Sequence, residues 1–239
     1  MYPLKRYKKS FPYSYTFGVF PTLELITNTP GDIDRIIIHS KGERNRGVQK
    51  IITLCEKQRL PIETNDRAIE KLASKANVFA VGVFTKRFHE LAPAKNHVVL
   101  IHPGSMGNLG TIMRTMLGFG IRDLAIILPA ADPFDPKTIR ASMGAVFRLR
   151  VARFESLPAY LAMNPRHAYL LTGAGETRLD QVHFNEPYAL IFGNESSGID
   201  SSVLSLGTSV TIPQSNQIDS FNLAVSVAIT LYQTQLPKT

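Results

Sequence analysis

The sequence has a single cysteine, Cys55, among its 239 residues. One cysteine excludes a disulfide within the chain and a zinc site built from several thiolates, and it favours a reducing cytoplasm. Cys55 shares helical spacing with Val48, Ile51 and Ile52, so we expect a buried core thiol. No apolar stretch is long enough to span a membrane, and the basic N-terminus lacks the apolar core of a signal peptide. We therefore expect neither a membrane-spanning segment nor a signal peptide.

Several signatures of common enzyme classes are missing as well. The glycines at 104, 107 and 110 follow a strand-like run but do not form GxGxxG, and GxxxxGK[ST] is absent, which argues against dinucleotide and P-loop sites. The absence of GxSxG and HExxH argues against a serine hydrolase and a zinc protease. The six histidines are scattered. We expect no metal site, and we expect His102 to be a satisfied structural histidine.

Positive charge is what the sequence has in excess. Lys and Arg outnumber Asp and Glu by 27 to 19, for a formal net charge of +8, and 44% of the residues are hydrophobic. The apolar fraction is sufficient for a buried core. The charge favours a polyanionic partner, for which nucleic acid is the usual case, although a soluble protein can also be basic without one.

Strand-like and helix-like runs alternate along both halves of the chain. We predict a small α/β domain over residues 1–90 and a second domain over residues 97–239, with a polar linker near residues 87–96. In the second domain, the runs VVLIH, LAIIL, AYLLT, YALIF and SVTIP are continuously apolar, which predicts a parallel sheet covered on both faces. We place its helices from about Asn108 and over residues 219–233.

Two basic segments of the first domain are candidate RNA contacts. Residues 1–15 interleave tyrosine and phenylalanine with four cations, which are Lys5, Arg6, Lys8 and Lys9. Cations can meet phosphates while aromatic rings stack on bases; the alternative is a leader that docks loosely on its own domain. The segment KGERNRG supplies Lys41, Arg44 and Arg46, which are phosphate contacts or parts of a solvated turn.

The first of three polar clusters in the second domain lies at residues 102–120. Asn108 can cap the helix that follows it, and Gly110 permits close approach of backbone or ligand. Arg114 lies in an otherwise apolar helix, so its charge needs a partner. One interpretation is a salt bridge to a nearby acidic side chain. The other is a contact with a phosphate or a reacting oxygen at a cleft.

The second and third clusters follow two apolar runs. Asn194 and Glu195 come directly after YALIFG, at the carboxyl end of a strand, where open α/β sheets bind ligands. In the third cluster, SVTIP is followed by a polar loop and by Ser220 and Asn222 near the start of an apolar helix. Taken alone, these two side chains are most simply capping residues; the start of a helix also offers free N–H groups.

In this order, the three clusters resemble the signature motifs of the SpoU (TrmH-type) RNA ribose 2′-O-methyltransferases. Asn108, Gly110 and Arg114 match N-x-G-x-x-x-R, and residues 193–198 match G-N-E-x-x-G. Residues 212–222 match the motif I-P, six residues, then S-[LF]-N. The first five of these residues read IPQSN, where the family usually has I-P-M-x-G. The resemblance covers about residues 97–235. Residues 17–85 more weakly resemble the small ribosomal-protein-like RNA-binding domain that often precedes this catalytic domain.

The resemblance implies an α/β domain with a deep trefoil knot, a homodimer whose active site lies at the subunit interface, and S-adenosyl-L-methionine bound in the loops of the knot. By position, the cofactor-binding residues are Leu171, Thr172, Gly173, Phe192, Gly193, Asn194, Gly198, Ile212, Gln214, Ser220, Asn222 and Leu223. At the departure from the motif, Gln214 can still offer backbone groups, and Asn216 tolerates the left-handed conformation of the usual glycine.

The resemblance also assigns roles in methyl transfer to a ribose hydroxyl. Arg114 is the implied catalytic residue; because a guanidinium is too weak an acid to lose its proton readily, we expect it to polarise the hydroxyl or to hold an adjacent phosphate. Asn108 and Glu195 would position Arg114 or the ribose, and Ser220 and Asn222 would shape the cofactor and ribose site. Ribosomal RNA is favoured over transfer RNA. The alternatives are a non-catalytic RNA-binding or ribosome-assembly protein of this fold, and methylation of a base or a small molecule.

Overall fold

The computed structural model describes residues 1–73 and 77–236, so the last three residues of the predicted second domain lie outside it. By their contacts, the residues form two compact units: unit 1 comprises residues 1–87 and 132–148, and unit 2 comprises residues 88–131 and 149–239. Residues 132–148 were predicted with the second domain but group with unit 1. They carry helix α5 (Pro136–Ala141), which packs against strand β1 (Tyr13–Phe17).

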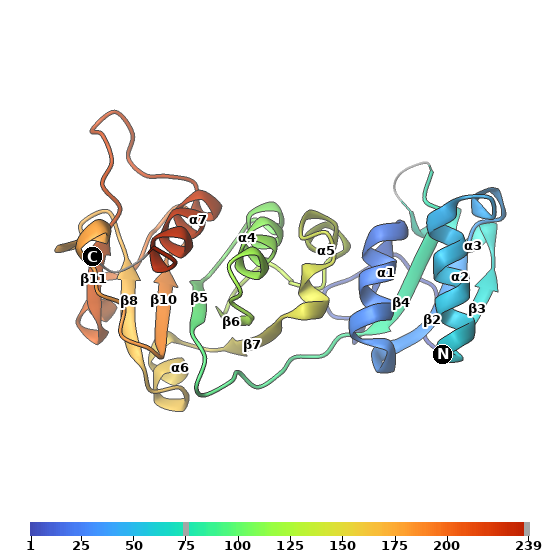
Figure 1. The fold of residues 1–239 in the computed structure, drawn as a ribbon, viewed down its shortest axis with the longest axis horizontal. Helices are drawn as coiled ribbons and strands as arrows, with labels where there is room; N and C mark the ends of the chain where they lie inside the picture. Colours follow the sequence, from blue (N-terminus) through green and yellow to red (C-terminus); the bar gives the residue numbers. More distant parts are fainter. Residues whose placement is uncertain (74–76, 237–239) are drawn as a thin grey trace. The chain divides into compact units, whose positions relative to one another are not determined.

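Unit 1 is built on a four-stranded sheet of order β1-β4-β2-β3 (Figure 1). Strands β1 and β2 run antiparallel to β4, and β3 runs parallel to β2. The remaining strands are β2 (Ile33–Ile38), β3 (Ile62–Thr64) and β4 (Ala80–Thr85), and the helices are α1 (Val19–Asn28), α2 (Arg46–Gln58) and α3 (Asp66–Leu72). This half of the chain thus contains both strands and helices.

Helices α2 and α3 of unit 1 begin where the sequence supplies a capping side chain. Asn45 accepts hydrogen bonds from the first N–H groups of α2, and Asn65 accepts one from the N–H of Ala68 in α3. Helix α2 buries Val48, Ile51 and Cys55 on one face, as predicted. Burial raises the pKa of the Cys55 thiol to about 11, so it stays protonated and inert at neutral pH.

The N-terminal segment is an ordered part of unit 1. The predicted leader ran to residue 15, but its last three residues belong to β1. The rings of Tyr2 and Phe11 stack on Tyr13, with centroids 4.5 and 5.0 Å away. The Tyr13 hydroxyl donates to the carbonyl of Pro3 at 2.7 Å. These rings are committed to the core of unit 1, so the aromatic side chains of the segment are not free to stack on bases.

Unit 2 is built on a seven-stranded, fully parallel sheet of order β7-β6-β5-β10-β8-β11-β9. Its strands are β5 (His97–Ile101), β6 (Asp123–Ile127), β7 (Arg150–Phe154), β8 (His167–Leu171), β9 (Thr177–Arg178), β10 (Tyr188–Phe192) and β11 (Thr208–Thr211). The helices are α4 (Met106–Gly118), α6 (Leu157–Met163) and α7 (Leu223–Thr234). The predicted parallel sheet is confirmed; β9, with two residues, is too short for any periodicity to show.

Both faces of this sheet are buried. On one face, Val99, Ile127 and Leu170 pack with Leu157 and Tyr160 of α6. Because side chains alternate along a strand, their buried neighbours point to the opposite face; these are Val98, Leu100, Leu124, Ile126 and Leu190. Helices α4 and α7 pack against each other and lie side by side across the sheet (Figure 1). None of the helices described is long and apolar enough to cross a membrane.

The amino ends of β6 and β7 are held by an ion pair between a buried carboxylate and a partly exposed arginine. Arg150 Nε and Nη2 donate to the two carboxylate oxygens of Asp123 at 2.7 and 2.5 Å, and the Ala92 N–H donates to Asp123 at 2.8 Å. The Asp123 side chain is 1% exposed and the Arg150 side chain is 38% exposed, so the loss of Arg150 would leave a buried carboxylate without its cationic partner. The pair therefore fixes the linker, which contains Ala92, to the end of the sheet opposite the strands' carboxyl edge.

His97 begins β5 and is fully buried. Its Nε2 lies 3.0 Å from the carbonyl oxygen of Ala92, and its Nδ1 lies 2.9 Å from the Tyr160 hydroxyl. Because a carbonyl oxygen only accepts, Nε2 carries the proton and Nδ1 accepts from Tyr160. Burial lowers the pKa of His97 to about 4, although the hydrogen bond to Ala92 opposes this shift. As the pH falls, the unfolded chain therefore takes up a proton before the folded one.

This difference predicts a loss of stability in acid. The contribution of neutral His97 is complete above pH 6.5 and decreases as the pH falls to about 4, a loss of up to about 3 kcal/mol in the free energy of unfolding. His97→Gln should flatten this part of the profile, whatever its effect at pH 7. His167→Gln, at an exposed position, should not. Urea denaturation across this pH range measures both slopes, and an unchanged slope in the His97 variant would contradict the assignment.

Candidate functional site

A cavity of about 520 Å³ lies at the carboxyl edge of the sheet of unit 2. Three loops line it: residues 171–173 after β8, residues 192–198 after β10 and residues 212–223 after β11; Asn108 of α4 joins them. All twelve predicted cofactor-binding residues lie in its lining, namely Leu171, Thr172, Gly173, Phe192, Gly193, Asn194, Gly198, Ile212, Gln214, Ser220, Asn222 and Leu223. The carboxyl ends of parallel strands meet at one edge, which explains why segments far apart in sequence converge here.

Two helix starts differ from the prediction, and both differences concern the site. Helix α4 begins at Met106, because the cap is Ser105, whose Oγ accepts from the Asn108 N–H at 3.2 Å. Helix α7 begins at Leu223, because Asn222 is its cap. Ser220 therefore lies in the loop before the helix and is not its cap. Since Asn108 is not the cap, its side chain is available to other residues of the cavity.

Glu195 is the centre of a hydrogen-bonded network. Asn108 Nδ2 donates to Glu195 Oε1 at 3.1 Å, and the Gly104 N–H donates to Glu195 Oε2 at 3.3 Å. Asn222 Nδ2 donates in turn to Asn108 Oδ1 at 3.2 Å. Three of the predicted catalytic residues are thus brought together from three separate segments of the chain.

The same hydrogen bonds determine the charge of Glu195. Burial raises the pKa of this carboxyl, but hydrogen bonds from the Asn108 side chain and from the backbone of Glu195, Gly104 and Ser105 outweigh burial, and the pKa lies below its ordinary value. Glu195 is therefore an anion at neutral pH. A carboxylate stabilised in this way accepts hydrogen bonds well but is a weak base, which suits a positioning role.

The loop that carries Glu195 is closed tightly on itself. Asn194 and Gly198 exchange backbone hydrogen bonds in both directions at 3.1 and 2.9 Å. A Cβ atom on Gly193 would lie 2.2 Å from the carbonyl carbon of Gly198, and Gly198 itself has φ of 67° in the left-handed region. Glycine is therefore required at position 193, where no Cβ fits, and favoured at position 198, where the backbone is left-handed.

The loop between β11 and α7 is held by fewer contacts. Figure 1 shows it projecting beyond the ends of the strands, and residues 213–220 are exposed. Gln214 Nε2 donates to the carbonyl of Asp219 at 3.0 Å and closes the loop. The departure from the family motif thus has a structural role, because the glutamine side chain bridges the segment that replaces I-P-M-x-G.

The charges of the cavity are of one sign. Among the residues described as lining it, Glu195 and Asp219 are acidic, and none is lysine or arginine. Its apolar surface comes from Leu171, Phe192, Ile212, Phe221 and Leu223. Such a lining disfavours phosphorylated ligands and accommodates a neutral or cationic molecule with a flat apolar part.

Arg114 does not line this cavity. It is exposed on α4, and none of the hydrogen bonds or ion pairs found among the described residues involves its guanidinium. Six residues separate it from Asn108, which turns it by about 120° around the helix axis and moves it about 9 Å along it. The interpretation of Arg114 as half of an internal salt bridge is therefore wrong for the residues that the structure describes, and its guanidinium forms no part of the lining of its own chain's cavity.

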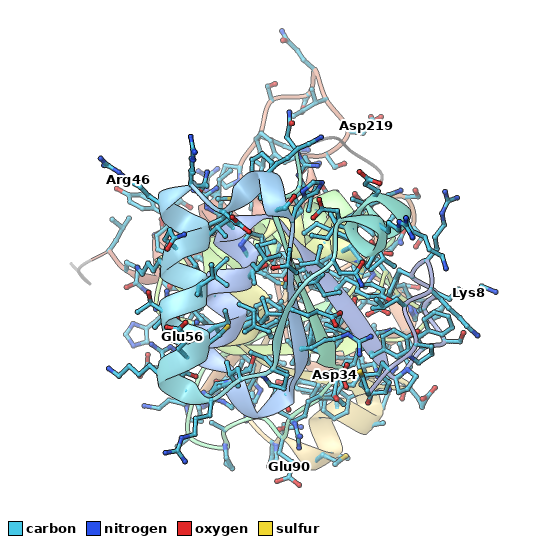
Figure 2. The ribbon with its side chains drawn as sticks, turned by 90° about the vertical axis from the view of Figure 1, so that its right-hand side faces the viewer. Lys8, Asp34, Arg46, Glu56, Glu90 and Asp219 are labelled. Atoms are coloured by element: carbon cyan, nitrogen blue, oxygen red, sulfur yellow. The ribbon has the colours of Figure 1, made fainter. Side chains whose placement is uncertain are left out.

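The predicted RNA-binding cations lie at the surface of unit 1. Lys5, Arg6, Lys8 and Lys9 are all exposed on the N-terminal segment, whose aromatic rings point inward. Lys41, Arg44 and Arg46 are exposed at and just before the start of α2. Figure 2 shows Arg46 at one end of α2 and Lys8 on the opposite side of the unit. The two basic segments therefore form two separate surfaces.

Four further residues of the site were not predicted from the sequence. Ser196, Asp219, Phe221 and Ser226 also line the cavity. The first three lie inside the motif segments, between residues that were chosen, so adjacency alone would have found them. Ser226 lies one helical turn after Asn222, which the helical spacing would have indicated.

Together, these features place unit 2 in a structural class: a parallel α/β domain with a loop-built cavity of small-molecule size at the carboxyl edge of its sheet. Residues 95–232 match the SpoU rRNA Methylase family. The match extends over more than half of the chain, and the protein belongs to this family.

Comparisons with individual proteins agree with the family. The chain is 34% identical over 133 residues to an uncharacterised tRNA/rRNA methyltransferase of Synechocystis sp., covering 54% of this chain and 48% of that protein. It is 31% identical over 150 residues to the 23S rRNA (guanosine(2553)-2′-O)-methyltransferase of Bacillus subtilis, covering 60% of this chain and 59% of that protein. The matches thus span about half of each relative.

Solved structures resemble nearly the whole chain. The AdoMet-bound rRNA methyltransferase of Sinorhizobium meliloti superposes with a TM-score of 0.79 at 23% identity, over 94% of this chain and 87% of that one. The SpoU methyltransferase AviRb of Streptomyces viridochromogenes, solved with AdoMet, gives a TM-score of 0.79 at 21% identity, over 93% and 89%. At these identities the likeness establishes the fold.

Proposed function

We propose that this protein transfers a methyl group from S-adenosyl-L-methionine to a ribose 2′-hydroxyl of structured RNA, with ribosomal RNA favoured over transfer RNA. The observation that carries the proposal is the cavity, in which all twelve expected cofactor residues meet and whose charged side chains are both acidic. Family membership and the relatives named as 23S rRNA 2′-O-methyltransferases support the same reaction. The direct test is whether the purified protein methylates ribose in RNA.

The residues of the cavity fit this cofactor. The apolar side chains of Leu171, Phe192 and Ile212 would accommodate the adenine ring, and the carboxylates of Glu195 and Asp219 favour a net cationic molecule over a phosphorylated one. When bound, the sulfonium group supplies an electrophilic methyl carbon. The protein's contribution is to align the ribose with it and to exclude water.

Glu195, Asn108 and Asn222 would hold the ribose. The Glu195 carboxylate accepts hydrogen bonds but is a weak base, so it would orient a ribose hydroxyl without taking its proton. Asn108 and Asn222 are linked to it by hydrogen bonds of 3.1 and 3.2 Å. Ser220, exposed at the cavity mouth, would contact the ribose or the cofactor.

We also propose that the site is completed by Arg114 of a second copy of the chain. On α4, the exposed positions around Arg114 are small: Gly107, Thr111 and Gly118. On the adjacent α7, Val225 and Tyr232 are 45% and 58% exposed and share one helical face. A flat surface beside an apolar stripe suits close packing of a second copy. In such a dimer, Arg114 of one copy would reach the cavity of the other copy.

Two further features of the family are proposed for this chain. The order of the strands, with β10 between β5 and β8 and with β11 between β8 and β9, supports the trefoil knot. The RNA substrate and the single, unpaired cysteine both favour the cytoplasm.

Unit 1 is proposed to bind the RNA, as the ribosomal-protein-like domain of the family would. Its residues include 19 Lys and Arg against 10 Asp and Glu, whereas those of unit 2 include 8 against 9. The whole excess of positive charge therefore lies in unit 1. Because the aromatic rings of the N-terminal segment are packed inward, that segment would contact phosphates by charge and would not stack on bases.

Removing these charges should weaken RNA binding in a salt-dependent manner. The double variant Lys5→Gln with Lys8→Gln, and the double variant Arg44→Gln with Arg46→Gln, should each bind ribosomal RNA less tightly at low salt. Each lost phosphate contact should reduce the slope of log affinity against log salt by about 0.7–0.9. Filter binding at several salt concentrations measures the slope.

The matched control removes two exposed charges from unit 2. Lys95→Gln with Arg122→Gln lowers the net charge of the protein by the same amount outside the proposed RNA surfaces. An equal loss of affinity in this control would show that net charge alone drives binding and would contradict a specific role for unit 1.

A non-catalytic RNA-binding protein is the second candidate, and the altered IPQSN loop favours it. Gln214 and Asn216 stand where the family usually has methionine and glycine. Calorimetric titration with S-adenosyl-L-methionine distinguishes the two candidates, because a protein that binds RNA but not the cofactor would be a retained fold without the activity.

A further inference from the structure

His102 is the first residue after β5 and has a backbone φ of 50°, in the left-handed region. Few residues other than glycine adopt this conformation, although histidine does so more often than most. Its N–H donates to the carbonyl of Ile127 at 3.1 Å and so continues the ladder between β5 and β6. The chain therefore leaves the sheet within this one residue, between its N–H and its carbonyl.

The carbonyl of His102 is bonded to the neighbouring loop. Asn194 Nδ2 donates to it at 2.6 Å. The other side-chain atom, Asn194 Oδ1, accepts from the N–H groups of Ser196 and Ser197 at 2.8 and 3.3 Å. The Asn194 side chain is thus the pivot of the turn after β10, and the His102 carbonyl anchors that pivot to β5.

The same bend directs the segment that leads into α4. Two residues later, the Gly104 N–H donates to Glu195 at 3.3 Å, and Asn108 Nδ2 donates to it at 3.1 Å. Glu195 is therefore held from two sides. Its own loop is anchored through Asn194, and its hydrogen-bond donors come from the segment after His102. Both depend on the conformation of residue 102.

The imidazole of His102 does not explain this arrangement. Its Nδ1 is buried, and it has no hydrogen-bond partner in the part of the chain that the structure describes. The expectation of a satisfied structural histidine is therefore wrong for this atom. What residue 102 supplies to the site is a left-handed backbone and a correctly aimed carbonyl.

We propose that His102 is a positioning residue, acting through its backbone conformation on Asn194 and, through that turn, on Glu195. The inference rests on the proposed function, because it concerns the geometry of that site. Nothing in the three signature motifs includes position 102; its role follows from its φ angle and from the bond to Asn194.

Variants that differ in their tolerance of left-handed backbone test the proposal. His102→Val places a β-branched residue in a conformation it avoids, and should raise the KM for the cofactor and lower kcat, each by about tenfold. His102→Gly adopts the conformation freely and should restore both constants to within about twofold of the unaltered protein. Overall binding of RNA, which is proposed to depend on unit 1, should be weakened in neither variant. If the glycine variant fails as badly as the valine variant, the ring is what matters and the proposal is overturned.

A double-mutant cycle tests whether His102 acts through Asn194. Asn194→Ala removes the other partner of the 2.6 Å hydrogen bond, so the effect of the two changes together should be smaller than the sum of their separate effects; additive effects would overturn the proposal. Hydrogen exchange provides a readout that does not need activity. The amides of Ser196 and Gly198 should exchange faster in His102→Val and not in His102→Gly, with thermal unfolding showing that both variants are folded.

These measurements distinguish a failure of the proposed function from a failure of the positioning role of His102. If the unaltered protein binds no cofactor and methylates no RNA, the proposed function fails, but the exchange pattern still decides the role of His102. If the unaltered protein is active and exchange in the turn is unaffected by His102→Val, the positioning role fails and the proposed function stands.

Discussion

Replacing Arg114 by alanine is expected to lower the rate of ribose methylation by at least about a hundredfold, the usual effect of removing a donor that stabilises developing charge. Binding of S-adenosyl-L-methionine should not change, because Arg114 does not line its own cavity. Single-turnover methylation and calorimetry measure the two quantities. A variant that bound the cofactor and methylated at the full rate would remove Arg114 from the mechanism.

Two comparisons sharpen this result. Arg122→Ala removes an exposed arginine from the same unit and should leave the rate unchanged. Arg114→Lys keeps the charge but loses the planar, five-donor fork of the guanidinium, so it should recover only part of the rate. Equal activity of the lysine variant would indicate that charge alone is needed.

Mixing of two inactive variants tests the shared site. If Arg114 acts on the cavity of the other chain, a dimer of Arg114→Ala with Glu195→Ala contains one cavity with both groups intact. Activity should therefore return when the two purified variants exchange subunits. Mixtures that remained inactive, despite exchange shown by mass spectrometry, would contradict a site built from two chains.

Replacing Gly193 by alanine is expected to abolish cofactor binding. The added methyl group would lie 2.2 Å from the carbonyl carbon and 2.3 Å from the carbonyl oxygen of Gly198. Both are backbone atoms of a turn closed by two hydrogen bonds, so they cannot move without opening the loop that carries Glu195. We expect the free energy of unfolding to fall by about 1–3 kcal/mol as well.

The matched control is Gly31→Ala, where an added Cβ meets no atom within 4 Å. It should leave both cofactor binding and stability near their original values. Calorimetry and urea denaturation on the two variants measure the difference. Full cofactor binding by Gly193→Ala would show that the turn is not part of the cofactor site.

Local signals predicted most of the fold. Helix α2 has one apolar face, and the helical spacing around Cys55 indicated that face because it depends only on neighbouring residues. Strand β1 was hidden for the opposite reason. Ser14 and Thr16 are buried together with Tyr13 and Tyr15, so no apolar and polar alternation marks a strand. Burial of those hydroxyls depends on partners that the sequence does not reveal, such as the carbonyl of Phe134, to which Ser14 donates.

In the site, too, features that depend on local sequence could be predicted, and features that depend on distant contacts could not. The loops of the cavity could be located because each follows an apolar run, and parallel strands end at one edge. The helix starts were misplaced because serine and asparagine both cap well, and the choice between Ser105 and Asn108 depends on Glu195, which engages Asn108. The left-handed backbone of His102 leaves no trace in composition or spacing, because the hydrogen bonds that accompany it are made with Ile127 and Asn194, which are distant in the sequence.

The account depends on methyl transfer to ribose. The most direct measurement incubates the purified protein with ribosomal RNA and S-adenosyl-L-methionine carrying a labelled methyl group, digests the RNA to nucleosides and locates the label. We predict a single 2′-O-methylated nucleoside, formed by the unaltered protein and not by Arg114→Ala. Label on a base, or no label although the protein binds the RNA, would contradict it.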